Sequence, residues 1–346
     1  MNLESLVQTL TQTHQALQQQ ANQSINVALV VRNWLFGYYI VEFEQQGEDR
    51  AEYGSHLMKD LAQRLKSLGV PSCSVSNLRN FRQFYQIYPQ IHQTASGEFV
   101  PDIPLKKLSE QFRLSWSHYQ TLMSIRNTEE RTFYEIESVS NQWSVRELKR
   151  QISSALFERL SLSRNTDEVK HLASKGQIIE APRDALKDPY ILEFLELKQH
   201  PDYSESELET AIIDKLEDFL LELGKGFFFG SRQKRFSFEE DHFYVDLVFY
   251  NRLLRCYVLI DLKIGKLTHQ DLGQMQMYVN YFDRYVKIEE ENPTIGIVLC
   301  QHKKDALVEL TLPKDANIFA SEYQLYLPSK EELRQQIQAA VEEIDQ

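Results

Sequence analysis

Three ionisable side chains lie in or at the end of two strongly apolar segments of this sequence. Asp246 interrupts the run Phe243–Tyr250, and Asp261 and Lys263 close the run that begins at Tyr257. Both runs are rich in β-branched and aromatic residues, which predicts two buried strands. An unpaired charge is costly in such a position, and the usual remedies are a charged partner or a metal ion.

The short segment between the two runs predicts that the acids come together. Arg252–Arg255 can form a hairpin turn, and the midpoint between Asp246 and Asp261 falls inside it. In an antiparallel pair these residues lie opposite each other, roughly 5 Å apart at Cα. Strand alternation also places Asp261 and Lys263 on one face. This set is typical of a hard-cation site with a cationic helper, and a structural Asp–Lys ion pair is the alternative.

Composition sets the broad class of the protein. The chain has 346 residues, which suits two domains, and a net charge of −12 that argues against histone-like, nonspecific nucleic-acid binding. A local basic groove remains compatible with this charge. Cys73, Cys256 and Cys300 form neither a zinc spacing nor a disulfide framework, which favours a reducing, cytoplasmic compartment. We expect no signal peptide and no membrane span.

The N-terminal part has helical periodicity. Apolar spacing, caps and breakers predict helices at 3–20, 25–46, 55–68, 76–88, 115–126, 128–139 and 144–160. Gly69–Pro71 separates two of them by a tight turn, as in a helix-turn-helix. A segment marked by Gly and Pro, 96–104, predicts a wing or hairpin.

The helix after that turn has the composition of a DNA-recognition helix. Its apolar residues recur at helical spacing, and the side chains expected on its outer face are Arg79, Asn80, Arg82 and Gln83. These types hydrogen-bond base edges and phosphates. An ordinary amphipathic helix facing water is the alternative.

The periodicity changes in the second half of the chain. Residues 166–200 are predicted to be a linker with one short helix near 190–197, because apolar density falls there. An α/β pattern follows, with helices at 205–223, 268–282, 305–310 and from 329, and strands at 227–230, 234–238, 242–250, 257–263, 294–300 and 323–327. Arg232, Lys234 and Arg235 are expected to clamp a phosphate, unless they only line a solvated strand edge.

These motifs resemble a known family. Asp246, followed fifteen residues later by Asp261-Leu-Lys263, resembles the signature of the PD-(D/E)XK nuclease superfamily. An ordered set of further segments resembles the YhcG-like family, a bacterial group with a helical domain ahead of a RecB-like nuclease domain. These segments are 32–37, 78–81, 220–224, 232–233, 246–251 and 296–300. The resemblance covers nearly the whole chain.

The resemblance implies an α+β protein of two domains. Residues 1–165 would form an all-helical, winged-helix or helix-turn-helix-like domain, and residues 201–346 an α/β, restriction-endonuclease-like domain. It also implies roles for three residues. Glu209 matches the acid of the preceding helix, and Gln274 and Tyr278 match a Gln-x-x-x-Tyr element. Glu209 would hold the ion through water or bind a second ion. Gln274 would orient Lys263 or a phosphate and Tyr278 would contact the nucleic-acid backbone, with packing and capping of their helix as the alternative.

Two positions depart from the pattern. Val245 stands where the family has proline, and Asp261 replaces the more frequent glutamate. The Asp261 carboxylate is one methylene shorter, so metal affinity or preference is expected to differ. Neither change removes a ligand.

The chemistry of the site follows from its oxygen donors. Mg²⁺, or Mn²⁺ in its place, prefers carboxylate, carbonyl and water oxygens, which Asp246, Asp261 and the carbonyl of Leu262 can supply. Such an ion lowers the pKa of bound water and neutralises charge on a phosphate. Lys263 is expected to position or deprotonate the attacking water, or to stabilise the transition state.

The expected function is therefore metal-dependent cleavage of DNA, delivered by the N-terminal helices. A homodimer would supply one site for each strand. Two alternatives stay open: a DNA- or protein-binding module that does not cleave, and an RNA nuclease.

Overall fold

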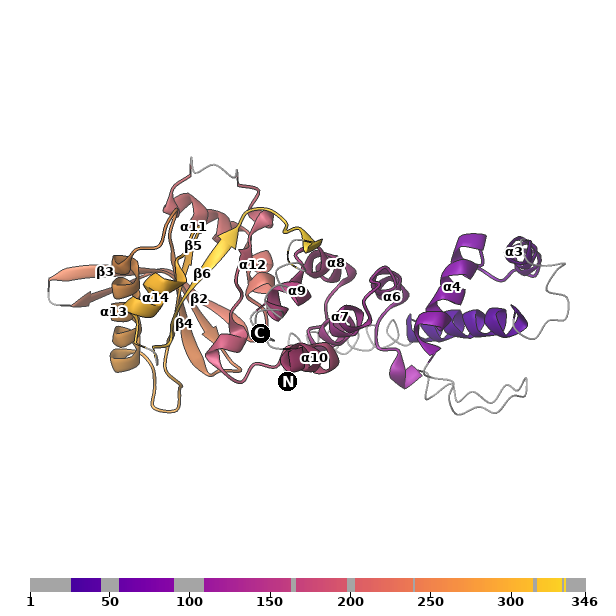
Figure 1. Ribbon diagram of the computed structural model, residues 1–346, viewed down its shortest axis with the longest axis horizontal. Helices are drawn as coiled ribbons and strands as arrows, with labels where there is room; N and C mark the ends of the chain where they lie inside the picture. The colour runs from indigo at the N-terminus through magenta and orange to yellow at the C-terminus, as the bar shows by residue number, and fades with distance from the viewer. Residues whose placement is uncertain are drawn as a thin grey trace, which may run out of the picture. The chain divides into compact units, whose positions relative to one another are not determined.

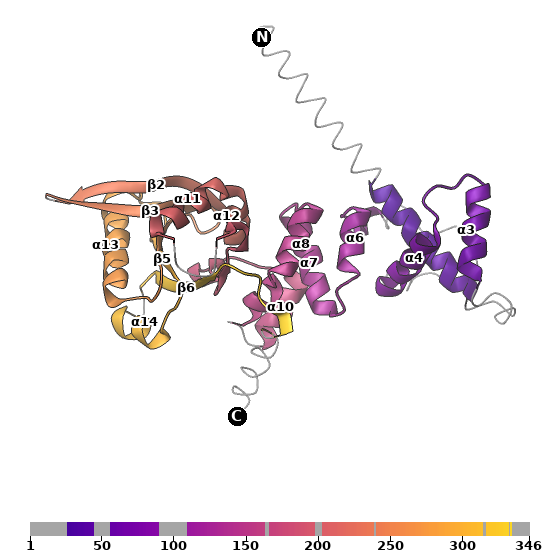
Figure 2. The ribbon, with the colours of Figure 1, turned by 90° about the horizontal axis from the view of Figure 1, so that it is seen from above.

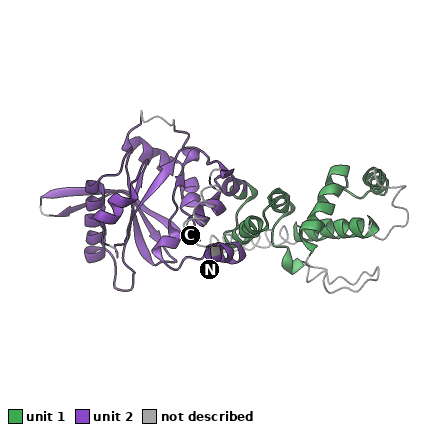
Figure 3. Ribbon diagram, viewed as in Figure 1, with its two compact units in different colours: residues 1–148 green, residues 149–346 purple. Residues whose placement is uncertain are grey.

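The computed structural model divides the chain into two compact units, residues 1–148 and 149–346 (Figure 3). The structure describes residues 26–44, 56–89, 109–162, 166–197, 203–238, 240–313, 316–331 and 333. The helix predicted at 3–20, the wing predicted at 96–104 and most of the predicted C-terminal helix lie outside these residues. Each unit is described by itself below.

Unit 1 is helical throughout its described residues. Its helices are 26–44, α3 (Leu57–Ser67), α4 (Val75–Ile87), α6 (Trp116–Leu122) and α7 (Thr128–Ser140). α8 (Val145–Ser153) crosses into unit 2. No strand occurs in the described part of residues 26–148, so the winged-helix detail has no support there.

The helix at 26–44 and α4 pack against each other at a glycine. A Cβ added at Gly37 would lie 2.0 Å from the Phe81 carbonyl oxygen, so only glycine permits this approach. Phe81 and Phe84 of α4 are buried on the inner side of the helix. The Ser74 side chain accepts a hydrogen bond from the Asn77 N–H and caps α4. The residues of α4 that are buried are the apolar ones predicted from the sequence, so the opposite side of the helix faces outward.

The helix predicted at 144–160 is broken. α8 ends at Ser153, and α9 (Leu156–Ser161) begins after Ala155, whose φ of 52° is left-handed. The break redirects the chain so that Arg159, which is 2% exposed, enters the interior of unit 2. A buried ion pair described below accounts for this path, and helical periodicity alone does not reveal it.

Unit 2 contains a six-stranded mixed sheet in the order β1-β6-β5-β4-β3-β2 (Figure 1). The strands are β1 (Tyr190–Ile191), β2 (Phe227–Phe238), β3 (Asp241–Asn251), β4 (Cys256–Leu262), β5 (Ile295–Cys300) and β6 (Ile318–Gln324). β2, β3 and β4 are antiparallel neighbours, whereas β4, β5, β6 and β1 are parallel.

Helices cover both faces of this sheet (Figure 2). α11 (Glu205–Asp214) and α12 (Leu216–Leu223) pack on one face, and α13 (His269–Tyr285) packs with α14 (Asp305–Thr311) on the other. α13 lies close to β5 because residue 296 is glycine: a Cβ there would lie 2.6 Å from Met275. The two apolar layers enclose the sheet, whose central strands are β5 and β4, in an α/β/α core. This arrangement agrees with the α/β domain predicted from the sequence.

The segment predicted as a linker, 166–200, is instead part of unit 2. It contains α10 (Thr166–Lys175), two short 3₁₀ helices (Pro182–Ala185 and Glu193–Leu195) and β1. β1 pairs in parallel with β6, more than 130 residues later in the sequence. The helix predicted at 205–223 is also divided at Lys215 into α11 and α12. The segment 166–200 has few apolar residues, and this composition did not indicate that part of it pairs with β6.

Glu222 of α12 is completely buried and joins three segments of unit 2. Its Oε1 accepts from Arg159 Nη1 at 2.6 Å and from the Ile191 N–H at 3.0 Å. Its Oε2 lies 3.4 Å from Arg150 Nη1, and Lys187 donates to its backbone carbonyl. Burial acts to raise the pKa of Glu222, but the three cations beside it lower it to about 2. Glu222 is therefore an ionised carboxylate buried among its three cations.

Two further features concern the chain as a whole. The three cysteines are free and buried. None of the helices in the described residues is both long and apolar enough to cross a membrane.

Replacing Arg159 by Ala is expected to lower the free energy of unfolding by about 3–5 kcal/mol, because Glu222 is left as an uncompensated buried charge. Denaturant unfolding at pH 7 measures this change. Lys170→Ala is the control, since its 4.0 Å ion pair with Asp167 is exposed and its loss is expected to cost less than about 1 kcal/mol. Equal effects of the two substitutions would contradict the structural role of the Glu222 network.

Candidate active site

The turn between β3 and β4 sets the register of the two strands. The Asn251 side chain accepts hydrogen bonds from the N–H groups of Leu253 and Leu254, at 3.0 and 3.1 Å, and its amide donates to the Lys225 carbonyl. The ladder then runs from Asn251↔Cys256 to Leu247↔Ile260. Asp246 and Asp261 follow one step further, which confirms the register predicted from the sequence.

β3 leaves β4 at this step. Residues 241–245 pair with β2 alone, so the β2–β3 ribbon extends beyond the rest of the sheet (Figure 1). The Leu262 N–H would lose its ladder partner here, and Asp246 Oδ2 accepts from it at 2.8 Å. Asp246 is thereby attached to the strand that carries Asp261. The candidate site lies at this fork between β3 and β4.

Lys263 completes the predicted triad. Its Nζ lies 2.8 Å from Asp261 Oδ2 and 3.7 Å from Glu205 Oε2, and its side chain is 17% exposed. Burial acts to lower the pKa of Lys263, but the carboxylates of Asp261, Glu205 and Asp246 raise it above its ordinary value. The side chain is therefore a cation that points at the carboxylates.

Asp261 is strained electrostatically. It is 2% exposed, and the ammonium of Lys263, 2.8 Å from its Oδ2, is the cation paired with it. Burial and then the charge of Asp246 raise the pKa of Asp261 to about 7, against the opposing effect of Lys263. Burial and the Asp246 charge together thus outweigh the effect of Lys263 on this carboxyl.

Glu209 approaches the same place from α11. It is 3% exposed, and its Oε1 lies 3.1 Å from Arg232 Nε. The Gln233 amide nitrogen donates both to Glu209 Oε2 and, at 3.0 Å, to Asp246 Oδ1. The structure therefore brings together the predicted residues Asp246, Asp261, Lys263 and Glu209, with Leu262 bonded to Asp246.

Sequence reasoning missed two members of this group. Glu205 lies one helical turn before Glu209, and this i, i+4 spacing places both on one side of α11. Its Oε1 accepts from the Ile264 N–H at 3.3 Å. Gln233 was part of the family resemblance but received no role. Its orientation depends on a backbone conformation that composition does not reveal.

Gln274 and Tyr278 lie one turn apart on α13, where the Gln274 amide donates to the Tyr278 hydroxyl. Burial and then the charge of Asp261 raise the pKa of Tyr278 to about 12, so the phenol faces the acidic site as a neutral group. Tyr278 is 1% exposed. Such burial does not fit the expected contact with a nucleic-acid backbone.

A divalent cation fits the donor chemistry of the site. No group of three His, Cys, Asp or Glu side chains within the described ranges forms a ready cage. Mg²⁺ needs no such cage, since one or two carboxylates with water and substrate phosphate are its usual ligands. Burial and the neighbouring Asp246 carboxylate disfavour the ionised form of Asp261, and a bound cation would favour it.

The predicted phosphate clamp lies on β2 beside the fork. Arg232, Lys234 and Arg235 are all exposed, although Arg232 is already paired with Glu209. Arg235 Nη2 donates to His242 Nε2 across the ribbon at 2.9 Å. These three cations belong to the strand that leads away from the carboxylates.

In unit 1, Arg79 and Gln83 of α4 are exposed, and Asn80 is half-buried. Arg82 differs from the expectation of a free DNA contact, because its Nε is paired with Glu44 at 2.8 Å. The side chains of α4 that are most available to a ligand are therefore Arg79 and Gln83.

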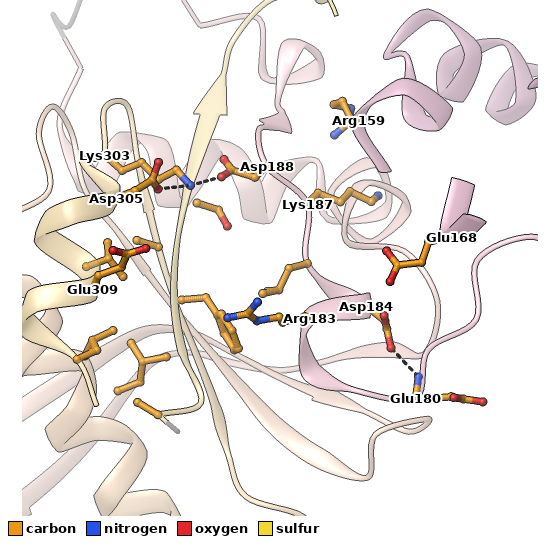
Figure 4. A pocket seen from close by; sticks show the side chains of 18 of the residues that line it. Arg159, Glu168, Glu180, Arg183, Asp184, Lys187, Asp188, Lys303, Asp305 and Glu309 are labelled. Atoms are coloured by element: carbon orange, nitrogen blue, oxygen red, sulfur yellow. Dashed lines mark hydrogen bonds and ion pairs between the residues drawn. The ribbon is translucent and has the colours of Figure 1, made fainter. Parts of the chain in front are cut away.

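A cavity of about 1540 Å³ in unit 2 contains none of the predicted site residues (Figure 4). It lies between α10, the segment that follows it, and β6. Several charged groups around it are already paired: Lys303 with Asp188 and Asp305, and Asp184 with the Glu180 N–H. The volume of a cavity therefore does not identify the predicted site, which lies at the fork.

Comparison with known proteins agrees with this organisation. Residues 183–338 match the family model described as the YhcG PDDEXK nuclease domain, and residues 9–159 match the DUF1016 N-terminal domain. A relative from Escherichia coli (strain K12), named "Putative nuclease YhcG", is 39% identical over 341 residues, covering 93% of this chain and 90% of the relative. The chain belongs to the YhcG family. The fork between β3 and β4 lies within its YhcG nuclease domain.

Two solved structures align with part of the chain. One is a repair endonuclease from Pyrococcus abyssi, 22% identical over 37% of this chain, with a TM-score of 0.25. The other is an EndoMS–dsDNA2 complex, 15% identical over 39% of this chain, with a TM-score of 0.26. The chain spans about half the length of each of these two solved chains.

In the metal-free protein, Asp261→Asn is expected to raise the melting temperature at pH 8. The folded-state pKa of Asp261 is about 7, above the ordinary value of 3.8, so ionisation destabilises the fold. The advantage of the variant should grow as pH rises from about 4 to about 7 and then level off.

Thermal unfolding in chelator at pH 4, 6 and 8 measures this advantage. Asp241→Asn, the same change at an exposed position, is the control. A melting temperature for Asp261→Asn that stays at or below the wild-type value at every pH would show that the acidic site is not frustrated.

Proposed function

We propose that this YhcG-family protein is a metal-dependent DNA endonuclease whose catalytic centre is the fork between β3 and β4. The observation that carries the proposal is the convergence of Asp246, Asp261 and Lys263 at one point, with Glu209 beside them. Family membership supports hydrolysis of a nucleic-acid backbone as the reaction class.

Each residue at the fork has a distinct task in this proposal. Asp246, Asp261 and the Leu262 carbonyl would hold a Mg²⁺ or Mn²⁺ ion, which when bound supplies Lewis acidity at the scissile phosphate. Lys263 supplies positive charge where negative charge builds on the phosphate during attack. Gln274 and Tyr278 form a neutral polar wall on α13, close to Asp261.

The protein offers basic groups on both of its units for a polyanion. Exposed Lys234 and Arg235 flank the fork on β2, and exposed Arg79 lies on α4. Phosphate contacts of this kind give affinity in spite of the overall charge of −12, because they act locally. We favour DNA over RNA, since the polar outer side of α4 suits a major groove. A homodimer would place one fork on each strand.

Asp261→Ala and Lys263→Ala are each expected to reduce Mg²⁺-dependent cleavage by at least about 10²-fold, because each removes charge that acts on the reacting phosphate. Purified proteins are incubated with supercoiled, linear and branched DNA in Mg²⁺, Mn²⁺ or chelator. Lys266→Ala, an exposed lysine three residues further on, is the matched control and should cleave like the wild type.

Full cleavage by both variants would show that the catalytic centre does not lie at the fork. Binding of DNA without cleavage, unchanged by chelator, would instead make the fold a recognition module. Matched RNA substrates distinguish the remaining alternative, because an RNA nuclease shares the phosphodiester chemistry but would prefer those substrates.

Replacing Arg79 and Gln83 together by Ala is expected to weaken DNA binding by at least about 30-fold, since contacts to bases or phosphates are each worth about 1 kcal/mol or more. Fluorescence anisotropy in chelator measures this affinity without cleavage. Lys66→Ala on the last turn of α3 is the control for loss of an exposed cation. Equal affinity of the double variant and the control would remove α4 from the DNA interface.

A further inference from the structure

Gln233 has an unusual backbone for a residue within a strand. Its φ of 44° lies in the left-handed region, which residues other than Gly, Asn and Asp seldom adopt. The β2–β3 ladder pairs Arg232 with Leu247 and Lys234 with Val245, but omits the position between them. At this interruption Gln233 lies across from Asp246. Such outliers persist where surrounding contacts require them, and they are often found at functional sites.

The side chain of Gln233 explains what the interruption achieves. Its single amide nitrogen has two N–H groups, one for Glu209 Oε2 and one for Asp246 Oδ1, the latter at 3.0 Å. Glu209 comes from α11 and Asp246 from β3, so the amide bridges two separate elements. Hydrogen bonds to ionised acceptors are stronger than neutral ones, and this bridge has two of them.

The neutrality of the amide is important for this position. A lysine or arginine between the two acids would join them equally well, but would cancel the charge that a cation requires. Glutamine joins them and adds no charge of its own, so the cation paired with Glu209 is Arg232 alone among the described residues. The remaining Asp246 oxygen is held by the Leu262 N–H, so the carboxylate is restrained at both ends by neutral donors. This arrangement keeps the group both ordered and negative.

We propose that Gln233 is a positioning residue that holds Glu209 against Asp246 in the arrangement that binds the divalent cation. The inference rests on the proposed function, because it assigns Gln233 to the same cation. Neighbours that orient metal ligands typically contribute 10–100-fold to metal affinity. The left-handed backbone directs the amide to both acids, so the conformation and the contact form one device.

Three substitutions distinguish the effect of the Gln233 side-chain amide from the effect of its left-handed backbone conformation. Gln233→Gly removes the amide and accepts the left-handed φ without strain. Gln233→Asn also tolerates that φ and keeps an amide, but it is one methylene shorter and reaches at most one of the two carboxylates. Ser237→Ala, on the exposed part of the same strand, changes no contact of the acids and is the control.

The experiment is a titration of full-length protein with Mn²⁺ in the absence of DNA, followed by the electron paramagnetic resonance signal of free Mn²⁺. Gln233→Gly and Gln233→Asn should each bind at least about tenfold more weakly than wild type, and Ser237→Ala should bind normally. Cleavage by the two Gln233 variants should recover as Mn²⁺ is raised, since the loss lies in affinity. Thermal unfolding in chelator verifies that every variant is folded.

The outcomes distinguish this inference from the proposal on which it rests. Wild-type binding that Asp261→Ala abolishes, but that both Gln233 variants retain at full affinity, would overturn the role of Gln233 and leave the nuclease proposal standing. Absence of Mn²⁺ binding by the wild type would overturn both. Weaker Mn²⁺ binding by the Gln233 variants, with cleavage that does not recover at higher Mn²⁺, would show a structural defect. It would also overturn the positioning role.

Discussion

The point at which β3 separates from β4 determines the rest of the site. A central strand cannot lose its neighbour without leaving backbone groups unpaired, and here the orphaned Leu262 N–H is paired by the Asp246 carboxylate. One hydrogen bond thus ends the ladder and fixes an acid beside Asp261. Because β4 is enclosed by apolar layers on both faces, Asp261 is buried beside Asp246 and has little water to screen their repulsion.

Confining the acids in this way costs electrostatic free energy, and neighbouring side chains offset part of that cost. Lys263 compensates Asp261, Arg232 compensates Glu209, and Gln233 binds Asp246 without neutralising it. The raised pKa of Asp261 shows that the compensation is incomplete. A fold selected for stability alone would place apolar residues at these positions. Local instability retained inside a well-packed domain is the usual sign that the position serves a ligand.

Local chemistry in the sequence was enough to predict the centre of the fold. The short turn before Cys256 set the strand register, and β-branched runs identified β3, β4 and β5. Long-range pairing was not accessible, so the segment that supplies β1 resembled a linker. The break at Ala155 was hidden for a related reason, since its cause is the contact of Arg159 with a residue 63 positions away. The contacts of Gln233 could not be predicted from the sequence for two reasons. Its backbone angle is rare, and its two partners come from separate elements.

The Glu222 network shows that domains defined by sequence and by packing differ in this family. The DUF1016 match ends at residue 159, and the YhcG nuclease match begins at 183. Packing instead divides the chain after residue 148. Arg150 and Arg159 belong to the first match by sequence, yet they neutralise Glu222 at the centre of the second unit. A chain truncated at residue 183 would keep the buried carboxylate and lose both arginines. A nuclease unit that keeps both cations therefore has to include Arg150 of α8 as well as α9, because these charges come from the N-terminal family segment.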